Sequence, residues 1–421
     1  MSFVRHRDPV LGEEVFLART QRGLPVRVLP RPHLREFAAV ITFGYGSVDL
    51  AFDTGSGLLR SPAGTAHYLE HKLFEDEELA VFQRFSARGA RVNAQTGFSR
   101  TTYFFQCAER FEDNLRDLLR LVSRPHLTDE NVEKERGIIA QEVRMYEDSP
   151  DQGAAFSLLS ALFAEHPVRL TVGGTVESIG EITKESLMQA YSAFYRTGNA
   201  SLAIAGPVDP QAALDLAEAC ELQAGAAPMR ADVADFGPAS KARVERALAV
   251  ARPKLLVGLK ERTKAQGAFA RARRAAATGV VLDRSFAGSS DLRERLQREG
   301  AFDDSLGAGY MGEKTFGFAN VGCDTDDPAR AEAAIRSLLT HGGAFDQEQL
   351  ERLRRRAIGA FVRGCESVRA LAFSHAAEGL EDGEPFVGMR ALASLTTDDV
   401  AQRRDELVRD ENLAVCVVRK A

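Results

Sequence analysis

Runs of apolar residues typical of strands and longer amphipathic patterns typical of helices follow one another along the chain. The strand-like runs include PVRVLPRP (25–32) and FAAVITFGYGSVD (37–49), and the helical patterns include RFEDNLRDLLRLVSR (110–124) and NVEKERGIIAQEVRMYED (131–148). Helical spacing places apolar side chains three and four positions apart, whereas strands alternate with a period of two. The pattern therefore predicts a mixture of the α/β or α+β type.

Two segments of the chain resemble each other without gaps. Residues 182–206 (ITKESLMQAYSAFYRTGNASLAIAG) align with 395–418 (LTTDDVAQRRDELVRDENLAVCVV), so that Thr183 matches Thr396 and Asn199 matches Asn412, both at an offset of 213. Each segment predicts a helix that begins after a threonine N-cap, then an asparagine, then an apolar strand. We interpret the pair as a duplicated fold; the alternative is coincidence between two helix–strand units.

A stretch rich in Ala, Gly and Pro separates halves of similar size. The sequence LQAGAAPMRADVADFGPAS (222–240) shows little periodicity, which is typical of a linker. We expect an N-terminal domain at 1–222, a linker at 223–240 and a C-terminal domain at 241–421.

Composition and charge narrow the function classes. The formal net charge of −6 gives no field that would attract nucleic acid or an anionic membrane. The basic segment 259–277 is best interpreted as a solvated helix face. The five cysteines are scattered without metal-site spacing, which predicts reduced, mostly buried thiols. Neither a signal-peptide pattern nor an apolar run of 18 residues occurs, so we expect a cytoplasmic protein without membrane or nucleic-acid partners.

The stretch GTAHYLEHKLFED (64–76) holds two of the eight histidines of the chain four positions apart. If it is helical, His67, Glu70 and His71 share one face. Two imidazoles one turn apart can bind one Zn²⁺, and the glutamate between them can act as general base in metal-assisted hydrolysis. The alternative is a solvated cluster without metal.

A catalytic zinc site usually takes a third protein ligand, which must come from elsewhere in this chain. Glu135 and Glu142 lie seven apart in the second helical pattern and therefore share a face. One of them can complete the site while the other orients an imidazole. Without the histidines, both would be interpreted as ordinary surface charges.

These residues bear a resemblance to a known family. His67-x-x-Glu70-His71 followed by Glu142 resembles the inverted zinc motif of the inverzincin metallopeptidases, which include pitrilysin, insulin-degrading enzyme and the mitochondrial processing peptidases. The segments ARVNAQTGFSRTTYFF, VEKERGIIAQEVRMYEDSP and HPVRLTVGGTVESIGEIT resemble further family segments. The resemblance covers residues 10–210 strongly and the second half more weakly. It is closest to the bacterial branch associated with elongation factor P modification.

The resemblance implies roles for individual residues. It implies His67, His71 and Glu142 as ligands of one zinc ion per chain, Glu70 as the catalytic base and Glu135 as an auxiliary acidic residue of the catalytic site. It also implies that Asn93 and Ala94 lie on an edge strand that binds the substrate as an added β-strand. From the residues alone, RVNAQT is simply a hairpin strand.

The resemblance further implies an α+β architecture of two homologous α/β halves, each an antiparallel-rich sheet covered by helices. Such a unit forms half of a clam-shell peptidase and needs a second chain. Family members commonly carry an Arg-x6-Tyr pair in the second half; here Tyr310 is preceded at that spacing by Asp303. At the offset of 213, VVLDR (280–284) replaces the zinc motif. We therefore expect a heterodimer with a homologous subunit that supplies Arg-x6-Tyr; a homodimer is the alternative.

Two functions follow from the sequence. The first is a zinc endopeptidase that cleaves peptides or unfolded segments inside a dimeric chamber. The second is a non-catalytic or weakly catalytic binding subunit that uses the same fold to hold a partner. The complete set of three ligands and a base favours the first.

Overall fold

The computed structural model describes residues 3–8, 11–55, 57–75, 81–231, 233–287, 290–340, 346–381 and 383–421. The chain forms two compact units, and each combines segments from both halves of the sequence. The first unit contains Met1–Val143, Thr171–Ala231 and Ile358–Val387, and the second contains Arg144–Leu170, Asp232–Ala357 and Gly388–Ala421. No helix in the described part of the chain is long and apolar enough to cross a membrane.

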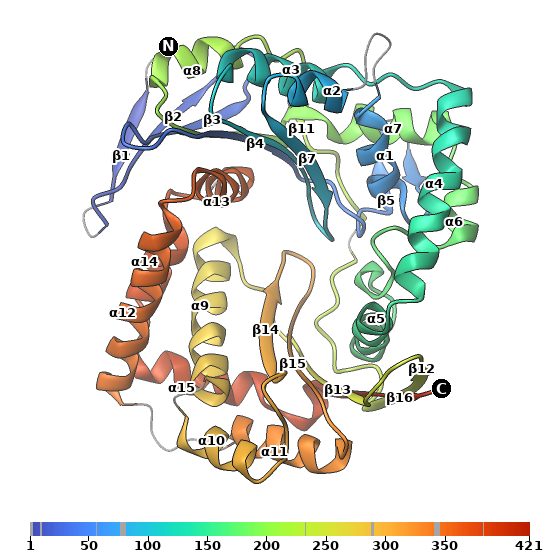
Figure 1. Ribbon diagram of the computed structural model, residues 1–421, viewed down its shortest axis with the longest axis vertical. Helices are drawn as coiled ribbons and strands as arrows, with labels where there is room; N and C mark the ends of the chain where they lie inside the picture. The colour runs from blue at the N-terminus through green and yellow to red at the C-terminus, as the bar shows by residue number, and fades with distance from the viewer. Residues whose placement is uncertain are drawn as a thin grey trace. The chain divides into compact units, whose positions relative to one another are not determined.

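The first unit is built on a seven-stranded sheet (Figure 1). Its order is β1 (Val4–Arg7), β2 (Glu14–Arg19), β3 (Pro25–Pro30), β10 (Ala200–Gly206), β4 (Phe37–Phe43), β8 (Thr101–Cys107) and β7 (Arg91–Thr96). Only the β3–β10 pair is parallel among these described strands. All seven residues of β10 are buried, because helices cover both faces of the sheet. The strand β7 forms one edge.

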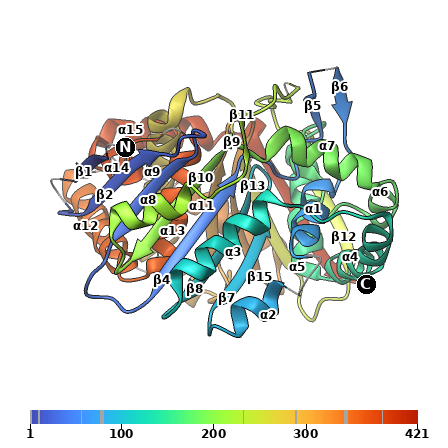
Figure 2. The same ribbon diagram turned by 90° about the horizontal axis from the view of Figure 1, so that it is seen from above.

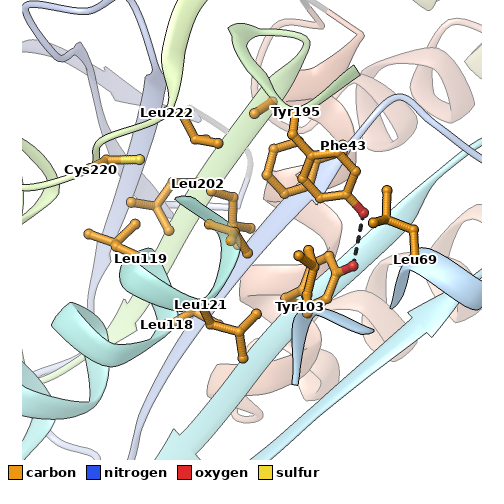
Figure 3. Close-up of a cluster of buried hydrophobic side chains, with 14 of the residues drawn as sticks. Phe43, Leu69, Tyr103, Leu118, Leu119, Leu121, Tyr195, Leu202, Cys220 and Leu222 are labelled. Atoms are coloured by element: carbon orange, nitrogen blue, oxygen red, sulfur yellow. Dashed lines mark hydrogen bonds between the residues drawn. The ribbon is translucent and has the colours of Figure 1, made fainter. Parts of the chain in front are cut away.

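Most helices of the first unit cover one face of its sheet. They are α1 (Thr65–Leu73), α2 (Val81–Ser86), α3 (Phe111–Ser123), α4 (Asp129–Glu147), α6 (Val176–Gly180), α7 (Lys184–Phe194) and α8 (Pro210–Ala217). Figure 2 shows α3 and α8 crossing in front of the strands. Figure 3 shows part of the core between these helices and the sheet, where the hydroxyl groups of Tyr103 and Tyr195 form a hydrogen bond of 2.8 Å. The helix α13 (Val368–Leu380) covers the opposite face through Leu371, Ala372 and Ala376.

The second unit has a five-stranded sheet. Its order is β12 (Arg243–Leu248), β16 (Leu413–Lys420), β13 (Lys254–Lys260), β15 (Gly317–Asp324) and β14 (Gly307–Gly312). Its helices include α5 (Pro150–Leu162), α9 (Gly267–Phe286), α10 (Asp291–Arg298), α11 (Pro328–Thr340), α14 (Val387–Ala393) and α15 (Thr397–Leu407), together with most of α12 (Gln347–Gly364). The helix α5 crosses β13 closely: a Cβ on Gly258 would lie 2.8 Å from Cδ1 of Leu162.

The predicted duplication is confirmed by the order of the strands. The order β3-β10-β4-β8-β7 in the first unit corresponds to β12-β16-β13-β15-β14 in the second. The matched segments also make the same local contacts. Thr183 and Thr396 both cap their helices in capping boxes. Asn199 and Asn412 each donate a side-chain hydrogen bond to the carbonyl five residues earlier, at 2.8 and 3.0 Å.

The two halves of the sequence exchange one equivalent helix each. The helix α5, from the first half of the sequence, packs on the sheet of the second unit, and α13, its counterpart, packs on the sheet of the first. The fold class predicted from the sequence is confirmed: both halves have antiparallel-rich sheets covered by helices. The consecutive domains 1–222 and 241–421 stay a prediction, because compact units and chain order divide the molecule differently. Part of the predicted linker, Gln223–Ala226, forms strand β11, which pairs with β9 (Arg196–Gly198).

Candidate active site

The helix α1 carries the histidine motif and is held firmly in the first unit. It begins after Gly64, whose φ of 94° favours glycine and whose Cβ position lies 2.5 Å from the carbonyl of Gly173. Tyr68 donates a hydrogen bond to the carbonyl of Val132 in α4, and Lys72 donates to the carbonyl of Asn131 at 2.8 Å. These bonds attach α1 to the first turn of α4. They leave His67, Glu70 and His71 on a shared face, as predicted.

The structure brings His67, His71 and Glu142 together. Nε2 of His67 lies 3.7 Å from Oε1 of Glu142, and Nε2 of His71 lies 3.3 Å from Oε2 of the same carboxylate. One ligand atom from each residue lies within 4.8 Å of the other two, and the described residues contain no second group of this kind. Two imidazole nitrogens and a carboxylate oxygen are a donor set typical of zinc, so the residues present fit that ion.

Glu135 contacts the other side of one histidine. Its Oε1 lies 3.0 Å from Nδ1 of His71. On α4, Glu135 precedes the ligand candidate Glu142 by about two helical turns. A carboxylate on Nδ1 fixes the tautomer and ring orientation so that Nε2 points toward the metal. His67 lacks such a contact: its Nδ1 is buried without a hydrogen-bond partner. Glu135 thus lies where it can orient His71, and its auxiliary role in catalysis stays a prediction.

The pKa values of the two histidines shift in opposite directions in the metal-free protein. Burial, together with the neighbouring His71, lowers the pKa of His67 to about 4. Burial also disfavours charge on His71, but its hydrogen bonds with Glu135 and Glu142 outweigh that effect and raise its pKa to about 9. The same hydrogen bond lowers the pKa of Glu135. The site therefore holds one neutral and one protonated imidazole at pH 7 before metal binds.

Glu70 lies between the histidines and is only 9% exposed. Burial raises its pKa, while a hydrogen bond from Thr96 opposes the rise. The hydroxyl of Thr96 lies 2.5 Å from Oε2 of Glu70. Sequence reasoning missed Thr96, although strand alternation places it on the same side of β7 as Ala94.

Asn93 and Ala94 lie on β7 at the edge of the seven-stranded sheet, as expected. Asn93 is exposed, and its Oδ1 accepts a hydrogen bond of 2.8 Å from the backbone N–H of Ala94. That N–H is therefore not used by the neighbouring strand β8. An extended peptide could pair with this edge if the asparagine side chain moved aside.

The equivalent region of the second unit has a different chemistry. The helix α9, which corresponds to α1, contains no histidine. Instead, Glu261 and Arg403 form a buried ion pair, and the guanidinium of Arg403 lies 5.8 Å from the ring centre of Tyr310. Arg403 is thus held by a carboxylate beside the tyrosine, so the two do not form an exposed arm for a substrate.

Comparisons with known proteins find similar sequences along most of the chain. Residues 46–176 match the family model described as insulinase (peptidase family M16), and residues 181–357 match the model described as peptidase M16 inactive domain. The zinc protease YmfH of Bacillus subtilis (strain 168) is 35% identical over 418 residues, which cover 97% of each chain. The mitochondrial-processing peptidase subunit beta of Caenorhabditis elegans is 31% identical over 161 residues, which cover 37% of this chain and 35% of that protein.

A solved structure is similar along the whole chain. The crystal structure of an M16-like peptidase from Alicyclobacillus acidocaldarius has a TM-score of 0.91 and 34% sequence identity, and the match covers 100% of this chain and 99% of the other. A protease from Helicobacter pylori shares the fold, with a TM-score of 0.82 at 19% identity.

Proposed function

The chain belongs to the insulinase family of peptidases, family M16, and on this premise we propose that it is a zinc-dependent endopeptidase. Its substrates are peptides or unfolded segments of proteins. The observation that supports this proposal most strongly is the convergence of His67, His71 and Glu142 around one point, with the buried carboxylate of Glu70 beside them.

Each residue of the site has a role in this proposal. His67, His71 and Glu142 hold the zinc ion, and Glu135 orients His71 through Nδ1. When bound, zinc supplies Lewis-acid chemistry that polarises the peptide carbonyl and acidifies water. Glu70 accepts a proton from the attacking water on its carboxylate and then donates that proton to the nitrogen of the leaving amine. Its burial excludes bulk water that would compete for the proton.

The edge strand β7 orients the substrate. An extended peptide that pairs with Asn93 and Ala94 gains main-chain hydrogen bonds with little demand on sequence. The exposed side chain of Asn93 is placed to bind the peptide backbone once it releases the N–H of Ala94. This mode suits unfolded segments, because a folded substrate has no free extended backbone to offer.

The active assembly in this proposal is a dimeric chamber in the cytoplasm. The domain 1–222 supplies the catalytic site, and 241–421 supplies a wall without metal. Because Asp303 stands where the family's arginine would precede Tyr310, a homologous subunit with Arg-x6-Tyr completes the chamber as a heterodimer. A homodimer is the alternative, since symmetric pairing is common in soluble proteins.

The proposal is tested by purifying the chain with any partner that co-purifies. We expect about one zinc per chain by elemental analysis and cleavage within a panel of unstructured peptides. A chelator should abolish the cleavage, and added zinc should restore it. Stoichiometric zinc without cleavage of any peptide, alone or with the partner, would favour the binding subunit instead.

A further inference from the structure

Thr96 contacts the proposed general base from the substrate-binding strand. It is the last residue of β7, and its hydroxyl oxygen lies 2.5 Å from Oε2 of Glu70. Its backbone N–H also interacts favourably with that carboxylate. Thr96 therefore approaches Glu70 with both of its donors, and the contact joins α1 to the edge of the sheet.

The neighbouring hydrogen bonds determine which way the Thr96 hydroxyl points. The hydroxyl oxygen of Thr101, the residue paired with Thr96 on β8, lies 3.3 Å from the hydroxyl oxygen of Thr96. Thr101 donates to the backbone carbonyl of Tyr45 at 2.8 Å, and a carbonyl can only accept. The proton of Thr101 is thus committed to Tyr45, so Thr96 receives none from it. Thr96 can donate its own proton to the shorter contact, the carboxylate of Glu70.

We infer that Thr96 is a positioning residue for Glu70, an inference that rests on the proposed function. By donating to Oε2, it holds the carboxylate in one rotamer and leaves Oε1 to accept the proton of the attacking water. A hydroxyl–carboxylate hydrogen bond is short and charge-assisted, so it resists rotation of the carboxylate. Thr96 therefore contributes by fixing the position of the Glu70 carboxylate rather than by changing its acidity.

The position of Thr96 also links the base to the substrate. Asn93 and Ala94 precede it on the same strand by three and two residues. With a rise of roughly 3.3 Å per residue, the backbone that pairs with the peptide lies about 7–10 Å along the strand from the residue that holds Glu70. The strand β7 therefore sets the register between a bound peptide and the proton acceptor.

The first test compares three isosteric or conservative variants of the complete assembly. Thr96→Val removes the hydroxyl and keeps the shape, so kcat should fall about 10- to 100-fold with KM unchanged, as for loss of other supporting residues. Thr96→Ser keeps the hydroxyl and should recover most of the activity. Thr197→Val is the matched control, because it removes a buried hydroxyl that donates to the carbonyl of Arg22 at 2.6 Å. Unchanged kcat in Thr96→Val would overturn the inference.

A second readout is independent of activity. In the zinc-free protein, a double-mutant cycle of Thr96→Val and Glu70→Ala should show thermal midpoints that are non-additive by on the order of 5 °C, because the two side chains interact. Additive midpoints would show that the hydrogen bond contributes nothing, and would overturn the inference even if the wild-type chain cleaves no peptide. An inactive, zinc-loaded wild-type assembly with a non-additive cycle would refute the proposed function and leave the contact between Thr96 and Glu70 established.

Discussion

Replacing Glu135 with alanine should weaken zinc binding without removing a ligand. The side chain of Glu135 is only 13% exposed and lies 3.0 Å from Nδ1 of His71, so solvent screens this contact weakly. A hydrogen bond to a charged group contributes about 1.5–3 kcal/mol. At about 1.4 kcal/mol per tenfold change in a dissociation constant, its loss should raise the Kd for zinc roughly 10- to 100-fold.

The assay is a competition between the protein and a zinc-binding chromophore at pH 9. The alkaline pH is chosen because His71 keeps a proton up to a pKa of about 9 in the metal-free protein, and Glu135 supports that proton. At neutral pH, the substitution would have two opposing effects on zinc affinity. Loss of the carboxylate that orients His71 weakens zinc binding, whereas easier loss of the His71 proton, which competes with zinc, strengthens it. At pH 9 the proton matters less, so the orienting effect dominates.

Glu133→Ala provides the matched control for this measurement. Glu133 lies on the same helix, but its side chain is 71% exposed and its contact is with Arg136 on the surface. We expect its zinc Kd to equal that of the wild-type chain. If Glu135→Ala binds zinc as tightly as the control, Glu135 does not orient His71. If it loses zinc as completely as a ligand variant, Glu135 is itself a ligand and the assignment of Glu142 is wrong.

Three further predictions concern the metal, the pH dependence and the partner. Glu142→Gln should hold far less than one zinc per chain after dialysis, and zinc retention equal to wild type in elemental analysis would exclude it as third ligand. Burial raises the pKa of Glu378 to about 7 despite the nearby Arg27, so its stabilising contribution is present below pH 4.5 and is lost as pH rises through 7. The free energy of unfolding of the wild type, relative to Glu378→Gln, should therefore fall by up to about 3 kcal/mol over that range, and a constant difference between their melting curves would contradict the assignment. A homologous subunit with Arg-x6-Tyr should raise weak peptidase activity of the isolated chain, whereas a fully active homodimer in light scattering and kinetics would refute the heterodimer.

The elements around the site could be predicted because their signals are local. The spacing of His67, Glu70 and His71 already requires a shared helix face, and the spacing of Glu135 and Glu142 does the same on α4. The threonine caps and the following asparagines were visible as a repeated pattern. In each case the evidence lies within about one helix and the strand after it, where periodicity determines which side chains face together.

The offset of 213 could not be extended along the whole chain. The equivalent helices α7 and α15 are separated by this offset, as are the strands β10 and β16. The equivalent strands β4 (37–43) and β13 (254–260), however, are separated by 217 residues. The difference arises largely between α5 and α7, where 21 residues (163–183) correspond to only 16 (381–396) between α13 and α15. The segment VVLDR therefore marks the equivalent of the zinc motif only approximately. The whole of α9 contains no histidine, so the second unit lacks the motif wherever the equivalent position falls on this helix.

Two features depend on contacts that sequence patterns do not encode. The exchange of α5 and α13 between the two halves of the sequence is invisible, because both helices are rich in apolar residues and nothing in their sequence shows which of two similar sheets they pack on. Thr96 was also missed, since a threonine at the end of a strand is ordinary until its distance from Glu70 is known. Both features are long-range in sequence, and only the folded chain reveals them.

The role of Glu70 as general base is tested most directly by comparing peptide hydrolysis by the wild-type assembly with that by Glu70→Gln at equal zinc content. The amide keeps the shape of the carboxylate and leaves His67, His71 and Glu142 in place, but it cannot accept the proton of the attacking water. We expect full zinc occupancy and a loss of kcat on the order of 10²–10⁴. Wild-type rates in a zinc-loaded Glu70→Gln enzyme would contradict the proposed mechanism.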